Sequence, residues 1–158
     1  MHVNPDEDWV PKTPEEGVLH AFMRVGRRMR SRQPGDTIDP STHFVMFALR
    51  WGGPVRLSEL ASRCQIDAST VSRQVRTLED AGLIERSPDP NDGRAFRIQL
   101  SDTGRTQLDE SMQRRKELLA RAMEGWKPSD IKTFEQLMTR FADGVNKIAE
   151  ERAMTETR

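Results

Sequence analysis

The chain has 158 residues, a length that fits one domain, or one domain with an appended helical part, and excludes a multidomain enzyme. Charged residues make up 32% of the chain and hydrophobic residues 35%, which predicts a polar, helix-rich protein. Because 25 Lys and Arg balance 25 Asp and Glu, the composition excludes a general polycation. Any contact with nucleic acid must therefore come from a local basic patch.

Two absences and one cysteine bear on where the protein works. The N-terminus has neither the basic region nor the apolar core of a signal peptide, and no apolar run approaches the roughly 18 residues of a membrane span. We therefore expect a cytoplasmic protein. Cys64 is the single cysteine, which fits a reducing compartment. Its place beside Leu60 and Ala61 predicts a small buried side chain; the alternative is a redox-sensing thiol, which needs solvent access and a lowered pKa.

The first elements are an arm and two helices. Residues 1–13 have no periodic pattern and are expected to form a flexible arm. From Pro14 apolar residues recur at spacings of three and four, which predicts a helix that ends near Gly35. The recurring residues are Val18, Phe22, Val25 and Met29. Asp39 as a cap followed by proline predicts a second helix that runs to Trp51.

The middle of the chain predicts two short helices and a hairpin. Asp67 is a good N-cap for the second of these helices, and Gly82 supplies the left-handed exit after it. Turn residues fill 88–93, so the hairpin is expected to have a long tip. The expected elements are a short strand over 55–57, a helix over 58–63, a helix over 67–81, and strands over 83–87 and 95–100. This order predicts a winged helix-turn-helix, whose second helix enters a DNA major groove.

The last third of the chain predicts two long helices. Ser101 is an N-cap candidate for a helix that runs to Trp126, and Pro128 opens the final helix. In that helix apolar residues alternate at spacings of three and four, a seam that packs against other helices. The seam consists of Ile131, Phe134, Met138, Phe141, Val145 and Ile148. The expected fold class is thus mainly α with a small β-hairpin (α+β).

The helix that starts after Asp67 carries the candidate DNA-binding residues. Its apolar side is expected to face the core and consists of Ala68, Val71, Val75 and Leu78. Its other side has hydroxyls and arginines and no acid before Glu79, which suits contacts to base edges and phosphates. The candidates are Ser69, Thr70, Ser72, Arg73, Arg76 and Thr77.

The hairpin tip supplies a second candidate contact. Arg94 can reach a minor groove or a phosphate, and Asp92 is placed to orient its guanidinium. Arg86 and Arg97 at the hairpin base are candidates for phosphate contacts, or else ordinary surface charges.

These residues resemble the multiple-antibiotic-resistance regulator (MarR) family of bacterial transcription factors. The similarity lies in Leu57-Ser-Glu-Leu-Ala61, Ser69-Thr-Val-Ser-Arg73, Leu78-Glu-Asp-Ala-Gly-Leu-Ile-Glu-Arg86, Asp89-Pro-Asn-Asp-Gly-Arg94 and Leu100-Ser-Asp-Thr-Gly104. The resemblance implies a homodimer that binds a pseudo-palindromic operator in double-stranded DNA, usually as a repressor. It implies the following division: a flexible arm over 1–13, a dimerisation and linking part over 14–51, a winged helix-turn-helix DNA-binding domain over 52–100, dimerisation helices over 101–152, and a flexible tail over 153–158.

The resemblance also implies release from DNA by a small aromatic or phenolic ligand. Candidate ligand-binding residues are Phe22, His43, Phe47 and Trp51, with Met23, Phe44 and Met46 nearby; the alternative is that these side chains belong to the core. No catalytic motif is present, so no catalytic residue is predicted, and the dispersed histidines predict neither a metal nor another cofactor. A winged helix that contacts a protein and not DNA stays an alternative, because the neutral net charge is compatible with it.

Overall fold

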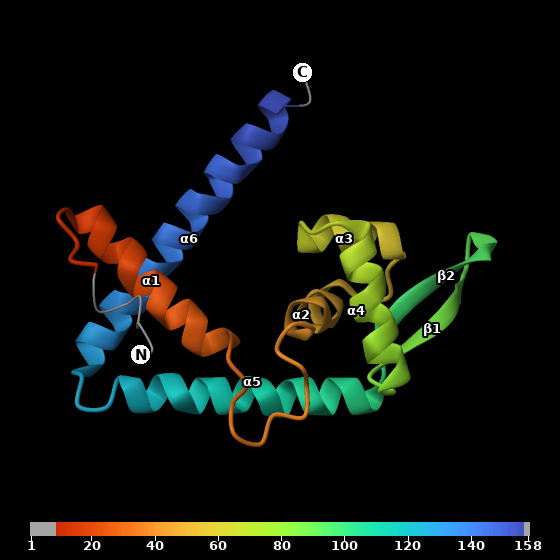
Figure 1. The fold of residues 1–158 in the computed structure, drawn as a ribbon, viewed down its shortest axis with the longest axis horizontal. Coiled ribbons are helices and arrows are strands. Elements are labelled where there is room, and N and C mark those ends of the chain that lie inside the picture. Colours follow the sequence, from red (N-terminus) through yellow and green to blue (C-terminus); the bar gives the residue numbers. More distant parts are fainter. Residues whose placement is uncertain (1–8, 157–158) are drawn as a thin grey trace, which may run out of the picture. The chain divides into compact units, whose positions relative to one another are not determined.

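The computed structural model describes residues 9–156, so residues 1–8 of the expected arm and 157–158 of the expected tail lie outside the described part. The chain forms two compact units, one up to Lys116 and one from Glu117, and each is described by itself. Six helices and one two-stranded antiparallel sheet make up residues 14–156 (Figure 1). None of the helices in the described range is both long and apolar enough to cross a membrane.

Helix α1 (Pro14–Arg30) begins where the sequence predicts. The hydroxyl of Thr13 accepts a hydrogen bond from the amide of Glu16 at 3.3 Å, and proline occupies the first turn, where no amide donor is needed. None of its residues is buried. Its large apolar side chains are instead between 50% and 54% exposed; they are Val18, Leu19, Phe22, Met23 and Val25.

Helix α2 (His43–Gly52) begins later than the sequence predicts. The carboxylate of Asp39 accepts from the amide and the hydroxyl of Ser41, at 2.8 and 2.6 Å, and so closes a local turn and does not cap the helix. One side of α2 is buried and consists of Val45, Met46 and Leu49. Met46, which the sequence offered as a residue near a ligand, therefore belongs to the core.

The next two helices match the predicted helix-turn-helix. Helix α3 (Leu57–Cys64) is followed by α4 (Ala68–Asp80), where the carboxylate of Asp67 accepts from the Thr70 amide at 2.8 Å. Gly82 has the expected positive φ, +68°. The prediction of a strand over 55–57 is wrong. Val55 forms one isolated bridge to Ile98, and helix α3 already begins at Leu57.

The hairpin has longer strands and a shorter tip than the sequence predicts. Strand β1 (Ile84–Asp89) pairs with β2 (Asp92–Leu100), and Asp89 lies opposite Asp92. A tip of only two residues, 90–91, remains. The reason is Asp89, whose buried carboxylate accepts from the Asn91 amide and thus holds the turn closed. Figure 1 shows the tip standing clear of α3 and α4.

The core of the first unit lies between α2, α3, α4, the hairpin and the first turns of α5. Its largest fully buried side chains include Ile38, Met46, Leu60, Leu78, Leu100 and Leu108. Cys64 is buried there too, as predicted, and burial raises the pKa of its thiol. A raised pKa and a buried sulfur both argue against a reactive thiolate.

Helix α5 (Asp102–Ala122) is fixed to the start of β1 by its first turn. Ser101 caps it as predicted, accepting from the Gly104 amide at 3.0 Å while its hydroxyl donates to the Gly82 carbonyl at 2.7 Å. A Cβ on Gly104 would lie 1.9 Å from the carbonyl oxygen of Leu83, so only glycine permits this close approach.

The second unit contains the end of α5 and all of α6. Helix α5 stops at Ala122, before the predicted end at Trp126, and Gly125 with φ +82° lies in the connection. Helix α6 (Pro128–Glu156) starts as predicted and continues into the segment that the sequence assigned to a tail. The apolar seam is exposed by about 40–53% from Phe134 to Ile148.

A buried polar cluster joins α5 to the segment before α2. Asp36, of which 5% is exposed, accepts from the Ser111 hydroxyl at 2.8 Å and from the Nε of Arg114 at 3.1 Å. The guanidinium of Arg115 reaches the other carboxylate oxygen at 3.2 Å. Burial alone would raise the pKa of Asp36, but these donors and the Gln33 amide outweigh it and lower the pKa. The carboxylate is therefore charged and fully paired.

His43 extends this cluster to α2. Because the carboxylate of Asp36 only accepts, the hydroxyl hydrogen of Ser111 is committed to it. The Nε2 of His43, 2.6 Å from the Ser111 oxygen, must then be the protonated ring nitrogen and donate. Burial and the nearby Arg115 guanidinium lower the pKa of His43, which favours this neutral form. Arg115 also donates to the Met29 carbonyl at 3.2 Å, so one cluster holds the end of α1, α2 and α5 together.

Candidate nucleic-acid interface

Helix α4 is held against the core by three side chains. Val71, Val75 and Leu78 are each at most 2% exposed, as the sequence predicts. The same prediction is wrong for Ala68, which is exposed because the core meets the helix only from Val71 onward. A helix anchored along one side in this way presents its opposite side at a fixed angle.

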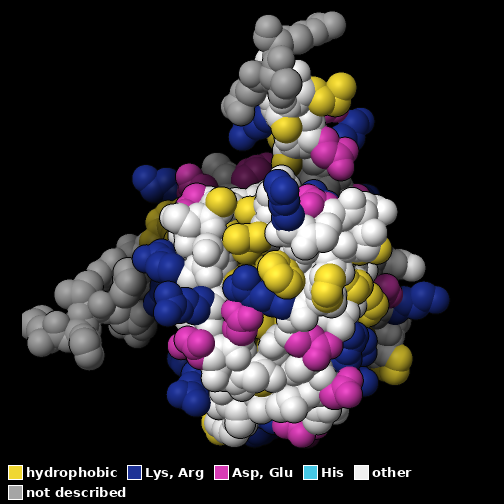
Figure 2. All heavy atoms as spheres, turned by 90° about the vertical axis from the view of Figure 1, so that its right-hand side faces the viewer, with side chains coloured by type: hydrophobic (Ala, Val, Ile, Leu, Met, Phe, Trp, Pro, Cys, Tyr) yellow, Lys and Arg dark blue, Asp and Glu magenta, His cyan; other side chains and the backbone are white. Residues whose placement is uncertain are grey.

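The opposite side of α4 carries the candidate DNA-binding residues together. Thr70 is partly buried, and the others are exposed: Ser69, Ser72, Arg73, Arg76 and Thr77. Figure 2 views the end of the molecule that carries α4 and the hairpin, and shows basic and acidic side chains interspersed. A net basic surface is therefore not what distinguishes α4. Its distinguishing feature is a stripe of arginines and hydroxyls along one helix.

Two hydroxyls of this stripe have their hydrogens committed within the protein. Ser69 donates to the carboxylate of Asp67, and Thr77 donates to the Arg73 carbonyl at 3.1 Å. Both residues are exposed, so each oxygen keeps a lone pair with which it can accept a hydrogen bond. Arg73 donates to the Thr70 hydroxyl at 3.3 Å and keeps its other guanidinium hydrogens available.

The arginines of the winged helix fall into two groups. Arg86 makes two hydrogen bonds to Glu79, at 2.7 and 2.8 Å, and Arg97 bonds Asp89 at 2.9 Å. Arg56 and Arg63 are paired too, with Asp89 at 2.8 Å and Glu59 at 2.9 Å. Because Arg86 and Arg97 are already engaged, they are better interpreted as structural charges. The guanidiniums of Arg73, Arg76 and Arg94 have no carboxylate partner within residues 9–156.

Arg94 lies at the start of β2, beside the hairpin tip. The sequence predicts that Asp92 orients its guanidinium; the structure instead has Asp92 accepting from the Arg94 amide, at 3.1 Å. Asp92 thus holds the backbone of Arg94 and leaves its side chain free to extend. A separate carboxylate oxygen of Asp92 lies 3.8 Å from the guanidinium of Arg56.

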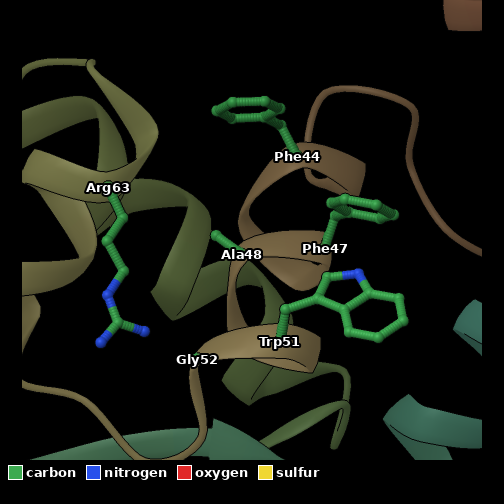
Figure 3. A pocket seen from close by; sticks show the side chains of 6 residues that line it. All are labelled: Phe44, Phe47, Ala48, Trp51, Gly52 and Arg63. Atoms are coloured by element: carbon green, nitrogen blue, oxygen red, sulfur yellow. The ribbon is translucent and has the colours of Figure 1, made fainter. Parts of the chain in front are cut away.

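A groove on the exposed side of α2 gathers part of the candidate ligand-binding set. It has a volume of about 570 Å³ and is lined by Phe44, Phe47, Ala48, Trp51, Gly52 and Arg63. Figure 3 shows the aromatic side chains extending from α2 and Arg63 extending from α3 toward Gly52. Phe47 and Trp51 meet edge to face, with ring centroids 6.1 Å apart.

The remaining candidates lie elsewhere. Phe22 is on α1, and His43 bonds Ser111 in the polar cluster, so neither lines the groove. Arg63 also lines the groove, and the sequence does not predict this residue as a candidate. The guanidinium of Arg63 lies where a Cβ on residue 52 would be, so its present position uses the space that Gly52 leaves open.

Comparisons with known proteins agree with this architecture. The model of the MarR family matches residues 38–96, from the segment between α1 and α2 into β2. The uncharacterised HTH-type transcriptional regulator YxaD of Bacillus subtilis is 31% identical over 112 residues, which cover 71% of this chain and 78% of YxaD. The HTH-type transcriptional repressor MdtR of the same species is 28% identical over 100 residues, 63% of this chain and 64% of MdtR.

A solved structure gives the same result for the fold. A MarR family protein from Bacillus stearothermophilus superposes with a TM-score of 0.75 at 22% identity, over 84% of this chain and 92% of that one. The six helices and the hairpin, the matching family model and the relatives together confirm the resemblance and the predicted fold class. The chain belongs to the MarR family and is a DNA-binding transcriptional regulator with a winged helix-turn-helix.

Proposed function

We propose that the protein is a homodimeric repressor that binds a pseudo-palindromic operator through α4 and the hairpin. The observation that carries this proposal is the stripe on α4, whose arginines lack carboxylate partners in the described chain while its apolar side is buried. In the proposed complex the stripe contacts base edges and phosphates in the major groove, and Arg94 enters the minor groove or binds the backbone. The proposed contacts are Ser69, Thr70, Ser72, Arg73, Arg76, Thr77 and Arg94. The protein acts in the cytoplasm and catalyses no reaction.

The exposed apolar faces of α1 and α6 support the homodimer. On α6 the seam contains Phe134, Met138, Phe141, Val145 and Ile148, all at least 40% exposed. A seam at three- and four-residue spacing is the pattern that helices bury against each other. In a twofold dimer both copies contribute the same surface, so a second copy of the chain can cover this apolar face with its own. Its twofold axis would place two α4 helices on successive turns of DNA, about 34 Å apart.

The groove on α2 supports release by a small ligand. Its aromatic side chains offer stacking surfaces. The guanidinium of Arg63 bonds Glu59 at 2.9 Å through one nitrogen, and its remaining donors offer a contact for a carboxylate or phenolate. We propose Phe47 and Trp51 as ligand contacts; Phe22 and His43 join them only if the ligand also reaches α1 and the polar cluster. The expected effect of such a ligand is a lower affinity for the operator.

A salt titration tests whether the protein binds DNA as proposed. Binding to duplex DNA of random sequence is expected to weaken steeply between 50 and 200 mM salt (about 10³-fold or more for six phosphate contacts), because each neutralised phosphate releases counterions. Fluorescence anisotropy of a labelled duplex measures the slope. A flat response, or no binding at the lowest salt, would instead support a winged helix that contacts another protein.

Alanine substitutions of Arg73 and Arg94 are expected to change DNA binding in different ways. Arg73→Ala is expected to lower the operator affinity by about 1–3 kcal/mol and to relax the base preference at one position, because a bidentate base contact is lost. Arg94→Ala is expected to weaken all duplexes evenly if it binds phosphate, and to reduce the salt slope by about 1. Footprinting and competition with random DNA separate the two. Arg121→Ala, on the last turn of α5, is the matched control and should change neither the operator affinity nor the salt slope.

A further inference from the structure

One carboxylate in the winged helix is buried although it lies beside the DNA-contacting elements. The side chain of Asp89 is 0% exposed, at the point where β1 ends in an irregular register. Its Oδ1 accepts from the Asn91 amide at 2.8 Å. Its Oδ2 accepts from two guanidiniums, the Nε of Arg56 at 2.8 Å and the Nε of Arg97 at 2.9 Å. The donor set is strong enough to lower the pKa of Asp89, with Arg56 as the first cause, so the group stays ionised.

Hydrogen bonds and one longer ion pair connect Asp89 to the backbone of Arg94. Arg56 is the residue before α3, and its guanidinium spans Asp89 and, at 3.8 Å, Asp92. Asp92 in turn accepts from the Arg94 amide at 3.1 Å. The start of the helix-turn-helix and the backbone of Arg94 thus belong to one network, and Asp89 is its buried centre. The tip itself has only two residues between the strands, so this network and the strand pairing hold its direction.

We propose that Asp89 is a positioning residue for DNA binding: through Arg56 and Asp92 it fixes the hairpin tip so that Arg94 meets the DNA at a set distance from α4. The inference rests on the proposed contact of Arg94 with DNA. It goes against simple electrostatics, because a carboxylate near phosphates repels them and because Asp89 withholds two arginines from the DNA. Positioning and electrostatics therefore predict opposite signs for the same substitution.

The substitution Asp89→Asn distinguishes a positioning role from a purely electrostatic one, because it changes only one of the two carboxylate oxygens into a donor. The amide keeps an oxygen for the Asn91 turn bond, while at the other position an NH₂ donor replaces the acceptor of both arginines. If Asp89 positions the tip, operator affinity falls about tenfold. If Asp89 acts only as a charge, affinity rises, since one negative charge is removed and two guanidiniums are released.

The test measures operator affinity by anisotropy for the wild type, Asp89→Asn, Arg94→Ala and the double variant. We expect the tenfold loss in the presence of Arg94 and no further loss in the Arg94→Ala background, because there is then no side chain to position. Asp92→Ala is the second variant; its side chain is 45% exposed, so the fold tolerates the change, and it should also weaken binding despite the lost negative charge. Urea unfolding of each variant identifies any that fail to fold.

The outcomes that overturn the inference are distinct from those that overturn the role of Arg94. Tighter binding by Asp89→Asn and Asp92→Ala, or an equal loss with and without Arg94, would contradict positioning while Arg94→Ala still weakens binding. If Arg94→Ala binds as the wild type does, both the proposed Arg94 contact and the inference fail. If Asp89→Asn is unfolded, Asp92→Ala alone and combined with Arg94→Ala gives the answer.

Discussion

Asp36→Ala is expected to lower the free energy of unfolding by about 3–5 kcal/mol, because it leaves the guanidiniums of Arg114 and Arg115 beside a cavity without their buried carboxylate. Urea denaturation followed by circular dichroism measures the change. Asp109→Ala is the matched control: its carboxylate pairs with Arg50 at 3.4 Å but is 55% exposed, so the expected loss is under about 1 kcal/mol. Equal losses in the two variants would contradict a structural role for the cluster.

The contribution of Asp36 is expected to depend on pH in the acid range. Its folded-state pKa is lowered, so the stabilisation is fully present above the unfolded-state pKa of about 3.9 and is lost as the pH falls through the lower folded value. The difference between the wild type and Asp36→Ala should therefore be largest near neutral pH and shrink below about pH 4. A difference that grows on acidification would contradict an ionised, paired Asp36.

Met138→Asp combined with Val145→Asp is expected to abolish the proposed dimer and to lower operator affinity by at least about 100-fold. Both side chains lie on the exposed seam of α6, and a pair of carboxylates cannot be buried against a second copy without partners. The affinity falls because two linked α4 helices bind far more tightly than one, by about 10²–10⁴-fold. Analytical ultracentrifugation gives the mass, and anisotropy gives the affinity.

Thr139→Asp combined with Asn146→Asp is the matched control for that experiment. Each of these exposed residues comes directly after one of the substituted seam residues in the sequence. The control therefore places the same two charges seven residues apart, but beside the seam. The control should stay dimeric and keep its affinity. A seam variant that remains a dimer would show that α6 is not the interface, whereas a monomer that binds the operator at full strength would contradict the need for two copies.

Local signals in the sequence were sufficient for most of the elements. Asp67, Gly82, Ser101 and Pro128 each mark a helix end by their own side-chain or backbone chemistry, and the structure confirms all four. Asp39 has the same acceptor group, but its carboxylate accepts from the Ser41 amide in a local turn and does not cap a helix. A cap and a turn use the same acceptor, so the sequence could not distinguish them.

At the candidate DNA interface, the sequence predicts the two sides of α4 but not the ion pairs of the arginines. The two sides of α4 follow from helical periodicity alone, and the burial of Val71, Val75 and Leu78 agrees. Which arginines are already paired does not follow from periodicity, because Arg86 and Arg97 find Glu79 and Asp89 only once the hairpin has folded back. The sequence likewise predicts Asp89 in the tip and not in a strand, because its partner Arg56 lies 33 residues earlier in the chain.

Selection from a randomised duplex library tests most directly whether the protein is a twofold, sequence-specific DNA-binding protein. Wild-type protein is incubated with the library at physiological salt, and the bound duplexes are amplified and sequenced over several rounds. We predict one enriched motif made of two inverted half-sites whose centres are about 10–10.5 base pairs apart. Bound sequences that match the input library, or a single half-site without its inverted copy, would contradict the account.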